Sequence, residues 1–278
     1  MNKRHACASA LALACIATTL PAAAQTSDWT GGYVGLHLGR VDKPKDGNDR
    51  FLFDTNLDGT YTDTVRTAAG ADAFSPGSCN GVANGATPGD GCRGNSGGAD
   101  WGVRAGYDWQ AGAWVFGVTG EYAMNDARDA VTSFSTTPAF YTMLRKVDGM
   151  YAVRARAGYT FGTGGDNLVY ATAGGARARI ENTYLTSNGV NTFTNNGNHT
   201  ASGHQYGVGY ERRLGERFTV GLEYLATRLD DGDYRVRAAG PAPATNPFIL
   251  QNAAGTDFRR SDSDLDLDSL RLTMNYRF

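Results

Sequence analysis

The last ten residues of the chain, Ser269–Phe278, read SLRLTMNYRF and alternate strictly between polar and apolar side chains. In an extended strand the apolar residues would share one face: Leu270, Leu272, Met274, Tyr276 and Phe278. Ten residues is about the length that a tilted strand needs to cross a bilayer. The stretch therefore predicts the closing strand of an outer-membrane β-barrel, and Tyr276 and Phe278 are its candidate assembly signal.

The same alternation occurs seven more times, at 32–40, 100–110, 114–122, 151–159, 168–181, 205–211 and 218–224. After residue 24 the chain has no run of about eighteen apolar residues that could form a transmembrane helix. The pattern predicts an all-β fold, an eight-stranded antiparallel transmembrane barrel.

The links between these segments alternate in length. Short links are expected at 111–113, 162–167 and 214–217, and long ones at 41–99, 125–149, 182–202 and 230–263. A barrel whose tight turns and both termini face the periplasm, and whose four long loops face outside, has this alternation, whereas a soluble β-sandwich has no reason for it. The Gly, Asn, Asp and Pro content of the long loops predicts mobility.

The amino terminus has the pattern of an export signal. Lys3 and Arg4 precede an apolar stretch at 6–20, and Ala22–Ala24 offer a cleavage site before Gln25. We expect residues 1–24 to be a signal peptide and 25–278 to be the barrel domain. Cleavage would remove two of the 26 basic residues and none of the 28 acidic ones, which leaves 24 minus 28, a net charge of −4. No basic patch indicates nucleic acid.

Two cysteines remain after the signal, Cys79 and Cys92, both in the first long loop. Export passes through an oxidising compartment, so these two residues are expected to form a disulfide.

Aromatic residues recur at a spacing of eight on the apolar faces: Trp101 and Trp109, Trp114 and Tyr122, Tyr151 and Tyr159. Eight residues of strand rise about 26 Å before tilt. The pairs are therefore expected at the two bilayer interfaces, where aromatic rings collect.

Several of these segments resemble a known family: WTGGYVGL at Trp29–Leu36, VRAGY at Val103–Tyr107, VRARAGY at Val153–Tyr159, GLEY at Gly221–Tyr224 and NYRF at Asn275–Phe278. They are similar to the small eight-stranded outer-membrane proteins of the OmpA-transmembrane and opacity-protein type, often labelled porin family. The resemblance covers Trp29–Phe278 except the loops. It implies the outer membrane of a Gram-negative bacterium, contact with lipid and lipopolysaccharide, and binding of the barrel-assembly machinery to the carboxy-terminal strand.

The resemblance is weaker for function, because such barrels include structural surface proteins, adhesins, narrow pores and a few enzymes. Charged residues on the faces opposite the apolar ones are expected inside the barrel: Arg104, Glu121, Arg154, Arg156, Arg177, Arg179, Glu181, Glu211, Glu223 and Arg271. Eight strands enclose a space that side chains fill, so we interpret these charges as a polar plug. The alternative interpretation is a gated narrow channel.

An enzymatic role would need a nucleophile and a base in contact. His37 is expected inside the barrel, His199 and His204 lie in or beside the third loop, and Ser202 stands near His204 without a nucleophile motif. We therefore expect no enzyme, no catalytic residues and no bound cofactor, and favour a structural or interaction role at the surface. A narrow diffusion pore is the alternative, followed by a lipid A-modifying enzyme.

The first long loop contains a partial calcium motif. Asp54–Asp63 reads DTNLDGTYTD, which matches the D-x-N-x-D-G opening of a calcium loop, but position twelve is Val65 rather than Glu. Asp54, Asn56, Asp58 and Asp63 are the candidate calcium ligands. The competing interpretation is that these residues only form turns.

Overall fold

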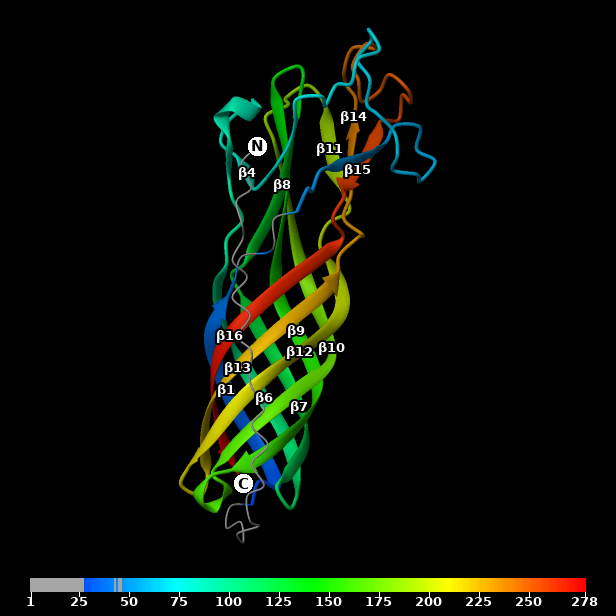
Figure 1. Ribbon diagram of the computed structural model, residues 1–278. Coiled ribbons are helices and arrows are strands. Elements are labelled where there is room, and N and C mark those ends of the chain that lie inside the picture. The colour runs from blue at the N-terminus through cyan, green and yellow to red at the C-terminus, as the bar shows by residue number, and fades with distance from the viewer. Residues whose placement is uncertain (1–27, 43, 45–46) are drawn as a thin grey trace, which may run out of the picture.

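The computed structural model describes residues 28–278, apart from 43, 45 and 46. The signal peptide expected at 1–24 lies outside the described residues. Within them, eight antiparallel strands close into a barrel (Figure 1): β1 (Gly31–Val41), β6 (Gly98–Ala111), β7 (Trp114–Asn125), β9 (Ala139–Phe161), β10 (Asn167–Thr186), β12 (His199–Leu214), β13 (Phe218–Asp230) and β16 (Asp264–Arg277). The ring is complete because β16 pairs with β1 and β10 pairs with both β9 and β12. The predicted eight-stranded fold is confirmed.

Side chains alternate between the wall and the lumen along each strand, as the pleat requires. Leu270, Leu272 and Met274 of β16 are exposed, whereas Arg271 and Thr273 between them are buried. The paired aromatic residues Trp101 and Trp109 also lie on the outer wall, 48% and 52% exposed. An apolar outer wall with a polar interior is what a barrel in lipid needs. No helix among the described residues is long and apolar enough to cross a membrane.

Short and long connections occupy opposite ends of the barrel. Residues 112–113, the 3₁₀ turn η2 (Thr163–Gly165) and residues 215–217 form the short turns. We call this the turn end; β1 begins and β16 finishes there, since Tyr33 pairs with Arg277. At the other end, β9 and β10 continue well beyond the barrel, and β9 alone has 23 residues. The second and third links are therefore shorter than expected, because much of 125–149 and 182–202 is strand.

The long connections build a second folded region, which we call the cap (the described residues of 42–97, 126–146, 182–198 and 231–263). Its strands and turn are β2 (Phe51–Asp54), β3 (Gly77–Asn80), β4 (Val82–Ala83), η1 (Pro88–Asp90), β5 (Cys92–Arg93), β8 (Arg128–Ser135), β11 (Thr192–Asn195), β14 (Val236–Ala239) and β15 (Thr256–Arg260). Four of them form a separate sheet in the order β11-β14-β15-β2, which stands above the barrel in Figure 1.

The cap has an aromatic core to which all four connections contribute. Phe51 of the first stacks on Phe258 of the fourth with ring centres 5.2 Å apart. Tyr141 of the second contacts Phe193 of the third at 6.1 Å. The predicted disulfide between Cys79 and Cys92 is confirmed, and it joins β3 to β5 within the first connection. The Gly, Asn, Asp and Pro content of the long loops did not predict such an ordered region.

One strand has the opposite face from the one expected. Arg177, Arg179 and Glu181 of β10 are exposed on the outside, whereas Ala178 and Ile180 between them are fully buried. The expectation that these three charges lie in the lumen was wrong. β10 extends past the lipid-facing belt, so its outer face meets water there and charge no longer marks the inside. A register shift against β9 between Arg179 and Ile180 adds to the irregularity.

Candidate functional site

The middle of the lumen contains a chain of ion pairs that crosses the barrel. Arg271 donates from Nε to Asp100 Oδ2 and from Nη1 to Glu121 Oε1, both at 2.6 Å. Arg154 binds the other oxygen of Glu121 at 3.0 Å and lies 3.5 Å from Glu223. The five residues lie on β16, β6, β7, β9 and β13, which are not all neighbours in the ring. The ion pairs therefore cross-link opposite walls of the barrel.

Two further groups extend this chain. Arg104 approaches Glu223 at 3.4 Å, and the Tyr170 hydroxyl donates to the same carboxylate at 2.8 Å. His37 lies beside the chain, with its ring nitrogens 3.5 Å from Asp100 and 3.7 Å from Glu121.

A second group of charges lies nearer the turn end. Arg156 donates to Asp108 at 2.7 Å and to Glu211 at 2.8 Å, and its guanidinium lies over the Tyr170 ring at 5.0 Å. Arg277 reaches the same Asp108 at 2.9 Å. Asp108 therefore joins two guanidinium groups from different strands.

Trp29 covers this group from the turn end. Its indole nitrogen donates to the Gly165 carbonyl at 2.9 Å, and its side chain is fully buried. Arg277 lies over the indole ring at 5.2 Å. The indole ring thus covers the lumen at the turn end, and its hydrogen bond to η2 fixes it in place.

Charge within the described lumen is balanced. Five arginines meet five carboxylates, and each of the ten residues is at most 6% exposed: Arg104, Arg154, Arg156, Arg271 and Arg277 with Asp100, Asp108, Glu121, Glu211 and Glu223. A buried ion without a partner is costly, so each group depends on its neighbours. The residues form a packed polar plug with no excess of either sign.

An apolar layer follows the charged plug toward the cap. It is built from buried side chains of several strands, among them Val147, Met150, Ile180, Leu229 and Leu265. Charge interactions therefore give way to hydrophobic packing in this part of the barrel. The sequence did not predict the layer, because Arg179 and Glu181 were expected in the lumen, which would put Ile180 between them on the lipid face.

Between the apolar layer and the aromatic core lies a network that we call the ionic collar: Asp49, Asp129, Arg145, His199, Asp231 and Arg260. Arg260 binds Asp49 at 2.7 Å and Asp129 at 2.8 Å. Arg145 binds Asp129 at 2.7 Å and Asp231 at 3.0 Å, and His199 Nε2 also contacts Asp231. The collar joins all four long connections or the strand ends beside them.

Asp129 is the centre of the collar. Burial by itself would raise the pKa of this carboxyl, but the attraction of Arg260 and Arg145 outweighs burial and holds the pKa below its ordinary value. Asp129 is therefore an ionised group at neutral pH, and the two guanidinium groups depend on it.

The structure brings seven of the ten expected lumen charges inside: Arg104, Glu121, Arg154, Arg156, Glu211, Glu223 and Arg271. It adds three that were not named, Asp100, Asp108 and Arg277. The signal for these was present, since Asp100 and Asp108 share the parity of Arg104 on one strand and Arg277 that of Arg271.

The histidines considered for catalysis lie apart from one another. His199 has Asn182 at 3.0 Å on Nδ1 and Asp231 on Nε2, so both ring nitrogens are engaged. His204 and Ser202 share the outer face of β12, where His204 stacks on Tyr206.

The two residues of the candidate assembly signal lie at the end of the closing strand. Phe278 is 75% exposed, and Tyr276 packs against Phe218.

The residues of the partial calcium motif bind backbone amides. Asp54 accepts hydrogen bonds from the amides of Asp58 and Gly59, and Asp63 accepts two from Thr55. The Thr60 amide donates to Asp58 and lowers the pKa of that carboxyl.

No group of three or more acidic, His or Cys side chains that could hold a metal occurs in the described part of the chain. The hydrogen bonds around Asp54 and Asp58 are those of turn formers. Calcium binding stays a prediction.

A family model of the outer membrane protein beta-barrel domain matches residues 8–278. The chain belongs to this family. Membership places the protein in the outer membrane of a Gram-negative bacterium. No curated protein matches the sequence.

Among solved structures, the outer membrane protein OprG from Pseudomonas aeruginosa is 14% identical with a TM-score of 0.50, over 91% of this chain and 98% of that one. Ail, the attachment invasion locus protein of Yersinia pestis, is 11% identical with a TM-score of 0.34, over 89% and 99% of the two chains. The outer membrane protease OmpT from Escherichia coli is 8% identical with a TM-score of 0.40, over 89% and 97%. The likeness to OprG shows the fold alone.

Proposed function

We propose that the protein is a surface protein whose closed barrel anchors the cap outside the cell, where the cap contacts other molecules. The observation that carries this proposal is the stacking of closed layers, in which the charged plug is followed by the apolar layer, the ionic collar and the shared aromatic core. A pore would gain nothing from four connections that fold together above a filled lumen.

The proposal includes the orientation, with short turns and both termini in the periplasm and lipid and lipopolysaccharide around the wall. The closing strand with Tyr276 and Phe278 is the segment that we expect the assembly machinery to bind. We propose no catalytic role, because both ring nitrogens of His199 are engaged and His37 lies among lumen charges. No observation on the described residues favours the pore over the closed anchor.

Cells that display the protein should adhere to other bacterial or animal cells through the cap. A suitable variant replaces residues 42–97 by about five Gly and Ser residues, which suffice because Val41 and Gly98 are paired neighbours. Adhesion should fall in this variant although equal amounts of heat-modifiable barrel are present. Equal adhesion of the wild-type protein and the loop-replacement variant to every cell type would overturn the interaction role.

A further inference from the structure

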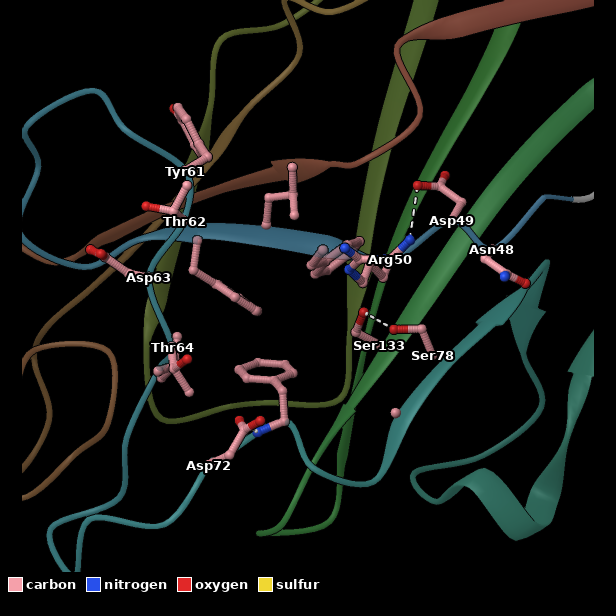
Figure 2. A pocket seen from close by; sticks show the side chains of 16 residues that line it. Asn48, Asp49, Arg50, Tyr61, Thr62, Asp63, Thr64, Asp72, Ser78 and Ser133 are labelled. Carbon is pink, nitrogen blue, oxygen red and sulfur yellow. Dashed lines mark hydrogen bonds between the residues drawn. The ribbon is translucent and has the colours of Figure 1, made fainter.

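The first long connection encloses a pocket of about 670 Å³, which is within the usual range of ligand sites. One wall is β2 and another is the segment 61–65, while β3 and Ser133 of β8 close the side opposite that segment (Figure 2). The pocket lies in the cap, so the proposed function puts it outside the cell.

Arg50 supplies to this pocket a solvent-exposed donor that has no protein partner among the described residues. Its backbone amide is engaged by Asp49 and Ser261, but its guanidinium has neither a hydrogen bond nor an ion pair within the described residues. Asp49 is not available to it, because that carboxylate binds Arg260 and Ser261. Figure 2 shows the Arg50 side chain reaching toward the middle of the pocket.

Other polar groups line the same pocket. The hydroxyl groups of Ser78 and Ser133 are 2.7 Å apart, so each has further hydrogen-bonding capacity. Asp72 accepts from the Phe74 amide with one carboxylate oxygen, which leaves the second for another donor. The pocket therefore offers both donors and acceptors at its edge.

An aromatic ring lies among these polar groups. Phe74 is only partly buried and lines the pocket, while other parts of its ring pack on Phe53 at 4.6 Å and Tyr141 at 5.2 Å. The contacts with the aromatic core fix the ring in place. A fixed aromatic ring beside polar groups suits a ligand with an apolar face and a hydroxylated edge.

The walls are held in place by the cap itself. Phe53 pairs with Asp63 across a β-bridge, and the Asp54 carboxylate holds the intervening turn. On the other side, Ser78 pairs with Ser133 next to the disulfide at Cys79. A preorganised site loses little entropy when a ligand binds.

We propose that this pocket binds a neutral sugar or a short neutral oligosaccharide. The C–H face of a sugar ring stacks on Phe74, while its hydroxyl groups bind Arg50, Asp72 and the Ser78–Ser133 pair. The lining has Arg50 against Asp49, Asp63 and Asp72, a net charge of −2, and Arg260 offsets only part of it because it binds both Asp49 and Asp129. That balance does not favour a sulfated or otherwise polyanionic glycan. The inference rests on the proposed function, because the pocket meets sugars only if the cap faces outside.

The test uses the full-length protein in detergent micelles and immobilised oligosaccharides of three kinds: neutral, uronate-bearing and sulfated. The wild-type protein should bind at least one neutral oligosaccharide. Arg50→Ala and Ser78→Ala should each weaken that binding about tenfold, which is the value of one or two lost hydrogen bonds. Arg235→Ala and Ser75→Ala, at exposed cap positions outside the pocket lining, are matched controls and should bind like the wild type.

No binding to any neutral oligosaccharide, binding confined to the charged ones, or neutral binding that both pocket variants retain would each overturn the inference. If the loop-replacement variant loses adhesion to cells while no sugar binds, the proposed function stands and the sugar pocket fails. If adhesion does not depend on the cap, the proposed function itself fails.

Discussion

The barrel and the cap are both built from antiparallel strands, but they sort their side chains in opposite ways. In the described part of the barrel, leucines and valines face outward and ten charged groups fill the interior. In the cap, aromatic residues such as Phe53 and Phe258 are buried, whereas charged residues such as Arg66 and Asp72 are exposed. The solvent explains the difference, since lipid surrounds one region and water the other. In a strand with period-two alternation, the apolar residues therefore mark the outer face where lipid surrounds the strand and the buried face where water surrounds it.

The largest effect is expected in the lumen. Glu121→Ala removes the carboxylate that binds both Arg154 and Arg271, and leaves two buried guanidinium groups without it. Loss of one partner from a buried pair costs about 3–5 kcal/mol. Urea unfolding of the purified barrel measures the change. Arg179→Ala breaks an exposed pair with Asp148 and is the control, with an expected cost of about 1 kcal/mol or less. Equal effects of the two variants would contradict the plug.

A substitution in the cap with a similar free-energy cost should leave the barrel folded. Phe258→Ala empties a fully buried position in contact with Phe51 and Phe248. A Phe→Ala change in a core costs about 3–5 kcal/mol, here confined to the cap. Limited proteolysis should cut the variant in the cap faster than the wild type, while heat modifiability stays unchanged. Loss of the folded barrel would show that the two regions are not separable.

Reduction of the disulfide should have a smaller effect. The bond joins residues thirteen positions apart, and the chain-entropy estimate for a loop of this size is about 3 kcal/mol. We expect faster cleavage between Cys79 and Cys92 after reduction and no change in barrel unfolding. Thiol labelling of the unreduced protein is the control, and two reactive cysteines there would refute the bond.

Acid should loosen the ionic collar. The folded-state pKa of Asp129 is depressed, so its contribution to stability is present above the unfolded value of about 3.9 and is lost as pH falls through the folded value. Cleavage of the cap by pepsin should therefore rise below about pH 4, after correction for the activity of pepsin on an unfolded substrate. Asp126→Asn changes an exposed carboxylate nearby and should not alter the profile. A corrected rate of pepsin cleavage that stays constant down to pH 2 would contradict the role of Asp129.

Much of the barrel could be predicted from the sequence, because each strand meets lipid on one side and a polar lumen on the other. Seven of the eight strands have the expected face. β10 does not, since its outward residues within the membrane, such as Ala171 and Ala173, are small, and its charges lie beyond the lipid. The rule that charge points inward holds only at membrane depth.

The cap and the collar could not be predicted in the same way. Arg260 and Asp49 are far apart in the sequence, and neither shows a local pattern that marks a partner. Phe74, Tyr141 and Phe248 come from three connections and meet only through tertiary contacts. The segment Asp54–Asp63 supplies residues 61–63 of the pocket lining, but its calcium motif does not predict a cavity.

Conductance of the refolded wild-type protein in a planar bilayer tests the closed lumen most directly. The charged plug, the apolar layer and the collar together predict no steady openings at neutral pH and moderate voltage. Openings of uniform, reproducible size would contradict the closed anchor and support a narrow pore.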